Sequence, residues 1–179
     1  MSDHSISIVP RQSTFQDNKQ KAKEILDWLV TKDIIKPKLS DCILNSDKGY
    51  AISTGAKQIT VFPNNLPINL TTNGLEIITE RQVFDTGENF VNKLTCPNCS
   101  ENIVFDDWDL SPWSNNESNN LTCPRCGQDA EIHNFLFEPE WGFSDLGFRF
   151  WNFPNLTHEF IEDFKRKLGC DISIVNQHF

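Results

Sequence analysis

One short phrase, Leu-Thr-Cys-Pro-x-Cys, occurs twice in this chain, at 94–99 and again at 121–126. The two copies have the spacing of paired zinc knuckles, in which four thiolates fill the tetrahedral shell of one Zn²⁺ ion. A filled shell leaves no open position for catalysis, so we expect a structural ion, unless His133 displaces a cysteine. The wide separation of the two pairs disfavours an iron–sulfur cluster. The sequence therefore predicts a zinc ribbon at 94–127 whose ligands are Cys96, Cys99, Cys123 and Cys126.

The net charge of −9 is concentrated around this ribbon. Between Leu94 and Phe148, Arg125 is the only basic residue and stands against ten acidic ones, so this segment alone carries −9. The rest of the chain, with 15 basic and 15 acidic residues, is neutral. A field of this sign repels phosphate backbones and attracts basic proteins. We therefore expect a basic protein surface as the partner and no nucleic acid.

The composition also indicates a compartment. No apolar tract approaches the length of a membrane span, so we expect no membrane association. The first residues, Met1 to His4, lack the basic start and apolar run of a secretory signal, which favours a cytoplasmic location. In a reducing compartment, six cysteines are four metal ligands and two thiols rather than three disulfides. Cys42 and Cys170 are then predicted to be small core residues.

The remaining pattern predicts a single α+β domain over 1–179, with the ribbon inserted before its last third. Apolar residues at helical spacing over 22–30 predict an N-terminal helix. Ser13 and Gln16 precede it with the spacing of a capping box. The helix needs a sheet or a second helix to cover its apolar stripe.

A C-terminal helix is expected over 157–168, where acidic residues come early, basic residues come late and Gly169 follows. Asn73-Gly74 lies between two apolar runs and predicts a hairpin turn. The strands should form an antiparallel sheet and are expected at 5–9, 50–53, 58–62, 68–72, 75–84, 147–153 and 171–175.

The ribbon loop from Phe105 to Trp113 mixes acidic residues with two tryptophans. Tryptophan is a frequent anchor of protein interfaces, and surrounding acidic residues steer a basic partner. One interpretation is therefore a binding surface, and the other is a solvated loop whose aromatic residues fold back onto the knuckles. Both stay open on the sequence alone. The first predicts these partner-binding residues: Asp106, Asp107, Trp108, Asp109 and Trp113.

Catalysis has little support in the sequence. Glu76 and Glu80 would share one face of a strand, as a polar pocket or as an ordinary solvated face. No nucleophile, base and oxyanion donor can be assembled around them, and 55–57 lacks the glycine spacing of a Walker loop. For the aromatic residues of 128–153 two interpretations stay open: they only form part of the core, or they also bind a ligand. We expect no enzyme, with a small hydrolase as an alternative.

Several motifs together resemble a known family. NGLEIITER at 73–81, IHNFLF at 132–137, GFSDLGFRFWN at 142–152 and the two knuckles are similar to small bacterial zinc-ribbon proteins labelled "sugar ABC transporter ATPase". The missing Walker motif argues against that label here. By type, the chain is also similar to immunity proteins of antibacterial toxins. That resemblance implies an inhibitor whose acidic ribbon covers the basic substrate groove of a toxin, for example a nuclease. A zinc-ribbon nucleic-acid-binding or regulatory protein is the alternative.

Overall fold

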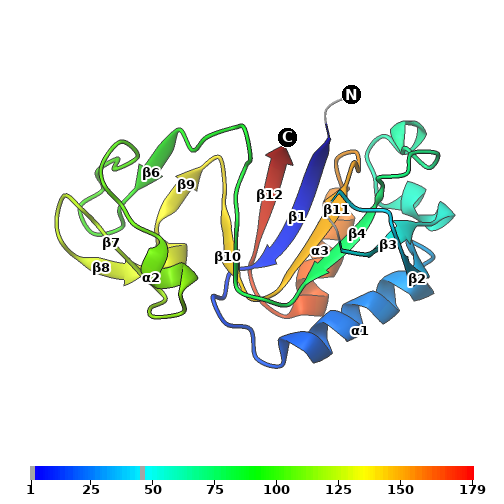
Figure 1. The fold of residues 1–179 in the computed structure, drawn as a ribbon, viewed down its shortest axis with the longest axis horizontal. Helices are drawn as coiled ribbons and strands as arrows, with labels where there is room; N and C mark the ends of the chain where they lie inside the picture. Colours follow the sequence, from blue (N-terminus) through cyan, green and yellow to red (C-terminus); the bar gives the residue numbers. More distant parts are fainter. Residues whose placement is uncertain (1–2, 45–46) are drawn as a thin grey trace.

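The computed structural model describes residues 3–44 and 47–179, and it has two lobes that lie side by side (Figure 1). The sheet lobe contains a six-stranded antiparallel sheet and two helices. The ribbon lobe, residues 93–141, projects from one side of it. The predicted class is confirmed: the fold is α+β, with a helix near each end of the chain and a four-cysteine segment inserted between them.

Each strand of the large sheet runs antiparallel to its neighbours. Along β1 the side chains alternate, so that Ile6 and Ile8 join the core under the helices while Ser5 and Ser7 lie on the other face. The first and last strands are neighbours, which places both ends of the chain at one side of the sheet. The strand order is β12 (Ile172–His178), β1 (His4–Pro10), β11 (Gly147–Trp151), β4 (Gly74–Ile78), β3 (Gly49–Ile52) and β2 (Ile35–Ser40).

Two helices cover one face of this sheet, α1 (Asn18–Thr31) and α3 (His158–Leu168). They meet where the Trp28 ring stacks on the Phe160 ring at 5.8 Å. The start of α3 is capped by the Thr157 hydroxyl, which accepts from the Phe160 N–H. Gly169 ends the helix at φ 75°, a left-handed conformation that glycine adopts without strain. The predicted C-terminal helix is therefore confirmed together with its stop at Gly169, and Thr157 caps it instead of starting it.

Ser13 does not cap α1, so the predicted capping box is wrong. The helix begins after Asp17, which has a left-handed φ of 54°. The Ser13 hydroxyl instead accepts from the indole N–H of Trp113 in the ribbon lobe, at 2.9 Å. The Ser13 hydroxyl, which the local pattern assigned to the start of the helix, thus bonds a residue 100 positions away in sequence.

Asn73-Gly74 is not a hairpin turn. Gly74 begins β4 in the middle of the sheet, where it pairs with Ala51. A Cβ at Gly74 would lie 2.5 Å from the Cys42 sulfur, so the glycine allows a close approach of chains. Cys42 is buried at this contact, as predicted for a core thiol.

The chain between β3 and β4 is irregular. It contains two short 3₁₀ helices, η1 (Thr54–Gln58) and η2 (Pro63–Asn65). The strands expected at 58–62 and 68–72 are not formed, apart from one isolated bridge at Thr60. Apolar runs of this length are ambiguous because they also suit loops that pack locally.

The ribbon lobe is built from short paired strands. β6 (Lys93–Thr95) pairs with β9 (Leu136–Glu138), and β7 (Asn120–Thr122) pairs with β8 (Asp129–Glu131). The lobe therefore extends beyond the predicted boundary at Gly127. Its other elements are α2 (Ser111–Ser114) and η3 (Ile132–Asn134), and the pair β5 (Gln82–Phe84) with β10 (Gly142–Ser144) connects it to the sheet lobe.

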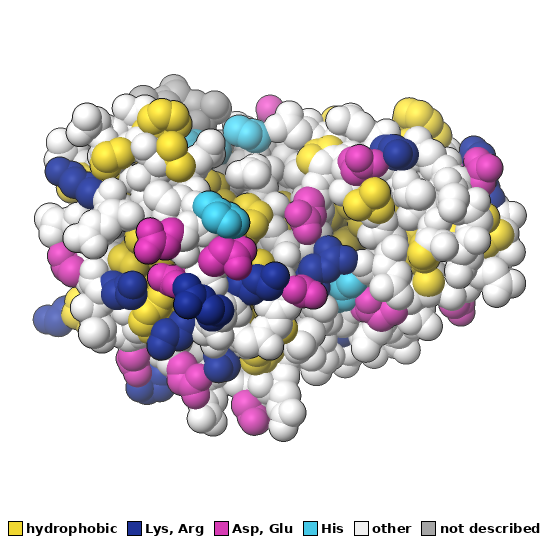
Figure 2. Space-filling model, turned by 180° about the vertical axis from the view of Figure 1, so that it is seen from behind, with side chains coloured by type: hydrophobic (Ala, Val, Ile, Leu, Met, Phe, Trp, Pro, Cys, Tyr) yellow, Lys and Arg dark blue, Asp and Glu magenta, His cyan; other side chains and the backbone are white. Residues whose placement is uncertain are grey.

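Charge is divided between the lobes. Figure 2 shows Lys and Arg side chains gathered low on the sheet lobe, which lies on the left in that view. The ribbon lobe contains two basic residues, Lys93 and Arg125, against nine acidic ones. The net negative charge of the molecule therefore lies on the ribbon lobe, at one end of the long axis.

Candidate metal centre

The four predicted ligands come together in the ribbon lobe. Their sulfur atoms all lie within 4.8 Å of one another. The Cys96 and Cys126 sulfurs are 3.9 Å apart, as are those of Cys99 and Cys123. Four thiolates around a tetrahedral ion with metal–sulfur bonds of about 2.3 Å would have their sulfurs about 3.8 Å apart. The arrangement can therefore hold a metal ion without rearrangement of the backbone.

The repeated sequence produces a repeated backbone. In each copy, the N–H of the residue after the second cysteine donates to the carbonyl of the first: Ser100 to Cys96 at 3.0 Å and Gly127 to Cys123 at 2.8 Å. Ser100 and Gly127 both have left-handed φ values, 62° and 70°. The Asn98 N–H also points at the Cys96 sulfur, at 3.4 Å. Both pairs of thiols are thus held by the tight turns of their own knuckles.

The thiols cannot all ionise easily in the absence of a cation. Burial opposes ionisation of Cys123, but the backbone N–H groups of Cys126 and Arg125 outweigh it and lower the pKa of this thiol to about 7. The N–H of Glu101 favours the Cys99 thiolate, yet burial and the neighbouring thiols raise the pKa of Cys99 to about 12. A second negative charge in the cluster is therefore unfavourable until a divalent cation compensates for it.

The single arginine of the ribbon neutralises part of the acidic loop. Arg125, inside the second knuckle, pairs with Asp106 at 2.7 Å and with Glu101 at 3.2 Å. Asp109 accepts from the Ser111 N–H at 2.8 Å at the start of α2. The Ser111 side chain and N–H lower the pKa of Asp109. Asp107 has no such structural role among the contacts of the described residues, and it is exposed.

The two tryptophans of the predicted binding surface differ. Trp113 is 1% exposed, so its predicted place on an exposed partner-binding surface is wrong. Its indole N–H donates to Ser13, and its ring packs edge-on against Phe143 at 5.4 Å. Trp108 is half-buried, and its indole N–H donates to the Val104 carbonyl at 3.2 Å. The interpretation in which aromatic residues fold back onto the ribbon holds for Trp113.

Phe105 is the exposed aromatic residue of the loop, with 96% of its surface accessible. It was not among the predicted contact residues. The signal was present in the sequence, since Phe105 stands directly before Asp106 and Asp107. Side-chain exposure depends on the path of the loop, however, and the tryptophans were favoured for their residue type alone.

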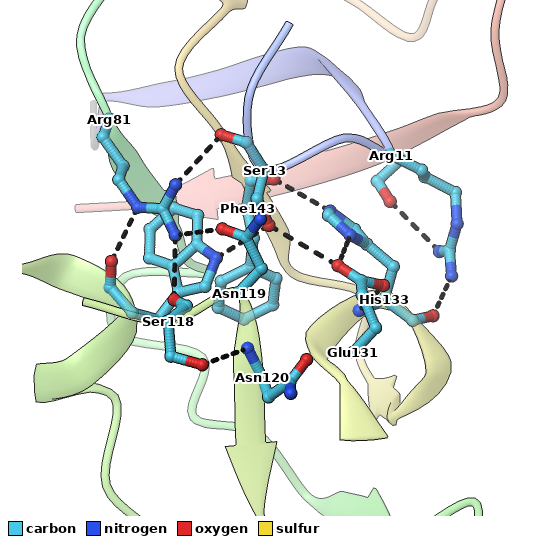
Figure 3. A network of polar contacts seen from close by, with 11 residues as sticks. Arg11, Ser13, Arg81, Ser118, Asn119, Asn120, Glu131, His133 and Phe143 are labelled. Carbon is cyan, nitrogen blue, oxygen red and sulfur yellow. Dashed lines mark hydrogen bonds and ion pairs between the residues drawn. The ribbon is translucent and has the colours of Figure 1, made fainter. Parts of the chain in front are cut away.

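A part-buried polar junction fixes the ribbon lobe against the sheet lobe, and Arg81 makes several of its contacts (Figure 3). The guanidinium lies 4.1 Å from the centroid of the Trp113 ring. It donates to the carbonyls of Trp113 at 2.6 Å and Ser118 at 3.1 Å, and to the Asn119 side chain at 2.8 Å. Burial lowers the pKa of Arg81, an effect that Asp145 opposes. One side chain from the sheet lobe thus binds two segments of the ribbon.

His133 belongs to the same junction and not to the metal centre. Its Nδ1 contacts a Glu131 carboxylate oxygen at 2.7 Å, and its Nε2 contacts the Phe143 carbonyl at 2.8 Å. Arg11 donates to the His133 carbonyl (Figure 3). Because both ring nitrogens have partners here, His133 does not replace a cysteine around the metal.

Of the two carboxylates considered for catalysis, Glu76 is engaged in structural contacts. Glu76 is 9% exposed and accepts from Arg149 at 3.3 Å and from the Trp151 indole at 2.9 Å. Glu80 lies beyond the end of β4, and both glutamates line one open hollow. Within residues 3–44 and 47–179, the four cysteines are the only cluster of at least three metal-ligating side chains. No helix in this part of the chain is long and apolar enough to cross a membrane.

No protein-family model matches this chain, and no curated protein and no solved structure matches it. The family resemblance of its motifs therefore stays a prediction. What the molecule does has to be argued from its own metal centre, charge and exposed surfaces.

Proposed function

We propose that this protein is a non-enzymatic binding module in which a structural Zn²⁺ holds an acidic recognition surface. Zinc is favoured over other ions because it is the ion that four cysteines in two Cys-Pro-x-Cys knuckles typically bind. Its role here would be to fix the two knuckles and the loop between them. The ion would complete a lobe whose own core is small.

The exposure of Phe105 carries this proposal. A fully exposed aromatic side chain on a loop tied down at both ends is typical of an interface anchor. The adjacent Asp107 is exposed, and Asp106 keeps Arg125 close to the loop. An anchor surrounded by acidic residues suits a basic protein surface, which the negative lobe would also attract over a distance.

The narrower form of the proposal is an immunity protein, cytoplasmic and bacterial, that neutralises a toxin by covering its basic substrate site. A toxin that binds a phosphate backbone needs a basic groove, and the acidic ribbon lobe is complementary to such a groove. Nucleic-acid binding by the ribbon itself is disfavoured, since Arg125 is already paired with Asp106 and Glu101.

Site-specific photo-crosslinking tests the proposal. A benzophenone amino acid replaces Phe105 in the full chain, which is then expressed in cells of its source. Phe62 offers a control because it is also an exposed phenylalanine, 54% accessible, but lies in the sheet lobe between β3 and β4. We expect position 105, and not position 62, to capture a protein whose toxic activity the purified chain inhibits.

The captured partner then has to meet a second criterion. Its association rate should fall at least tenfold between roughly 0.05 and 0.5 M salt, because screening removes the electrostatic steering. Equal capture from both positions, or a partner whose activity is unaffected by the chain, would exclude this role for the ribbon surface.

A further inference from the structure

A cavity of about 340 Å³ opens at the junction of the two lobes, between the end of β1 and the segment from η3 to β10. We call it the junction cavity. Its floor consists of the rings of Phe135, Phe137 and Phe143, each at most 5% exposed. Trp141 and Leu136 form its walls, and Leu136 is 55% exposed. An aromatic-lined space of this size accepts one large apolar side chain.

Charged groups stand around the mouth of the junction cavity. The lining includes two carboxylates, Glu138 and Glu140, and one guanidinium, Arg11. The carboxylates have exposed ion pairs, Glu138 with Lys93 at 3.3 Å and Glu140 with Arg11 at 3.4 Å. Pairs as exposed as these are weak and exchange readily with other cations. Figure 2 shows acidic and basic side chains side by side around a histidine at this junction.

The cavity is continuous with the acidic loop. Trp108 packs edge-on against two rings that line the cavity, those of Phe137 at 6.1 Å and Trp141 at 6.2 Å. An aromatic surface therefore runs from the loop that carries Phe105 to the cavity. A partner that contacts the loop would reach the cavity mouth over the half-buried face of Trp108.

We propose that the junction cavity binds an aromatic side chain of a basic segment of the partner, with a lysine or arginine on either side of it. The ring would be buried against Phe137 and Phe143, and the flanking cations would pair with Glu138 and Glu140. This inference rests on the proposed function, because it names the feature that the ribbon lobe recognises in its partner. The apolar floor supplies affinity, and the two rim carboxylates, by exchanging Lys93 and Arg11 for the cations of the partner, select the neighbours of the ring.

Capped tripeptides of defined charge test the inference on the intact, metal-loaded chain. The probes are Lys-Phe-Lys, Glu-Phe-Glu and Lys-Ala-Lys, added to protein labelled with ¹⁵N. The readout is the indole N–H signal of Trp141, which donates to Thr86 at 3.1 Å beside the cavity. Trp28 is the internal control, since it lies on α1 in the sheet lobe.

We expect Lys-Phe-Lys to shift the Trp141 signal with a dissociation constant on the order of 1 mM, and to leave Trp28 unchanged. The affinity for Glu-Phe-Glu should be at least about fivefold lower, because two weak ion pairs are lost and like charges meet. Lys-Ala-Lys should give no saturable shift. A flat Trp141 signal with Lys-Phe-Lys, or equal shifts from all three peptides, would overturn the inference.

A pair of variants removes ambiguity about the location. Leu136→Ala takes away an exposed wall and should weaken Lys-Phe-Lys binding by about threefold to tenfold. Leu70→Ala changes a leucine of similar exposure, 42%, in the sheet lobe and should leave binding unchanged. Equal effects of the two variants would contradict a site in the junction cavity.

The two proposals fail in different ways. If position 105 captures no toxic partner while Lys-Phe-Lys still binds beside Trp141, the proposed function fails and the preference of the cavity stands. If a basic partner is captured but its binding leaves the Trp141 signal unchanged, the cavity proposal fails and the acidic surface remains.

Discussion

The two lobes reach a folded state by different means. Among the described residues, the main core of the sheet lobe contains twenty buried residues, and that of the ribbon lobe contains ten, including Phe143 from β10 and two cysteines of the candidate metal centre. The strands of the large sheet run up to seven residues, whereas the ribbon strands have three each. A lobe with so little apolar burial needs other sources of stability. From this comparison we infer that the ribbon depends on its junction with the sheet lobe and on an ion that its four cysteines could hold.

Removal of one cysteine ligand should have the largest effect on the difference in stability between the two lobes. Cys123→Ser should unfold the ribbon lobe, because structural zinc contributes about 10 kcal/mol or more to small metal-bound folds. The sheet lobe should stay folded on its own core. Amide NMR signals would show this as loss of dispersion confined to the ribbon lobe. The control is Cys170→Ser, at a half-buried thiol outside the metal centre, and a folded ribbon lobe in Cys123→Ser would contradict a structural ion.

A second variant should destabilise the sheet lobe and not the ribbon lobe. Phe164 is fully buried and packs edge-on against Phe148 at 5.0 Å. Phe164→Ala should lower the free energy of unfolding by about 3–5 kcal/mol through lost burial and a cavity. Metal content per chain should remain one ion, as measured by a zinc-sensitive dye after denaturation. Loss of the metal below the unfolding midpoint would show that the lobes are not independent.

Metal affinity should depend steeply on pH, and the direction follows from the thiols. In the metal-free protein the pKa of Cys99 is raised to about 12, so this thiol is protonated near neutral pH and must release its proton to the ion. Cys126, whose pKa is also raised, must do the same. Each released proton weakens binding about tenfold per pH unit, so these two alone weaken it by at least about 100-fold, or about 3 kcal/mol, for each unit of acidification near pH 7.

Cys123 adds a second element to this pH dependence. Its pKa is lowered to about 7, so the thiol is mostly protonated at about pH 6 and mostly ionised at about pH 8. Metal binding should therefore release roughly one proton fewer at pH 8 than at pH 6. Calorimetry in two buffers of different ionisation enthalpy counts these protons. An unchanged proton count across this range would exclude the low pKa of Cys123.

The junction should have an intermediate effect. Arg81→Ala removes the charged donor to Trp113, Ser118 and Asn119 and leaves two part-buried carbonyls without this partner, which should cost about 1–2 kcal/mol. The ribbon lobe should then exchange its amide hydrogens faster while the sheet lobe does not. Arg166→Ala, at a site with 74% side-chain exposure, is the matched control and should have little effect.

Sequence reasoning succeeded where the determining contacts are local. Each knuckle, and α3 with Gly169 after its end, were predictable because each depends on residues a few positions apart. It failed where a contact with a residue distant in sequence determines the local structure. Ser13 accepts from Trp113 instead of capping α1, and Gly74 accommodates Cys42 instead of forming a turn. These contacts exist only after the lobes and strands have come together.

The same distinction explains the candidate site. Metal ligands are fixed by spacing within the knuckles, and all four were predicted correctly as a cluster. Partner-binding residues depend on which side chains of the loop remain exposed, and that is a property of the folded lobe. Residue type alone favoured Trp113, which is buried, over Phe105, which is exposed. All residues that line the junction cavity except Arg11 come from the stretch 132–143, but the sequence does not show that this stretch folds around an open space.

The smallest expected effect on stability separates two neighbouring acids of the loop. Asp107→Lys changes an exposed side chain and should alter the free energy of unfolding by less than about 0.5 kcal/mol. Asp106→Lys instead replaces the partner of Arg125 by a second cation and should destabilise the ribbon lobe by roughly 1 kcal/mol. Chemical denaturation of both variants in parallel measures this difference.

On partner association the same two variants should behave alike, because both reverse the sign of a charge next to Phe105. Each should slow association severalfold at low salt, with the difference from the unmodified chain shrinking as salt screens the field. A variant at Asp107 that is fully stable and associates slowly would show that this acid serves recognition rather than folding. If Asp107→Lys leaves the association rate unchanged at low salt, the acidic loop is not the surface that meets the partner.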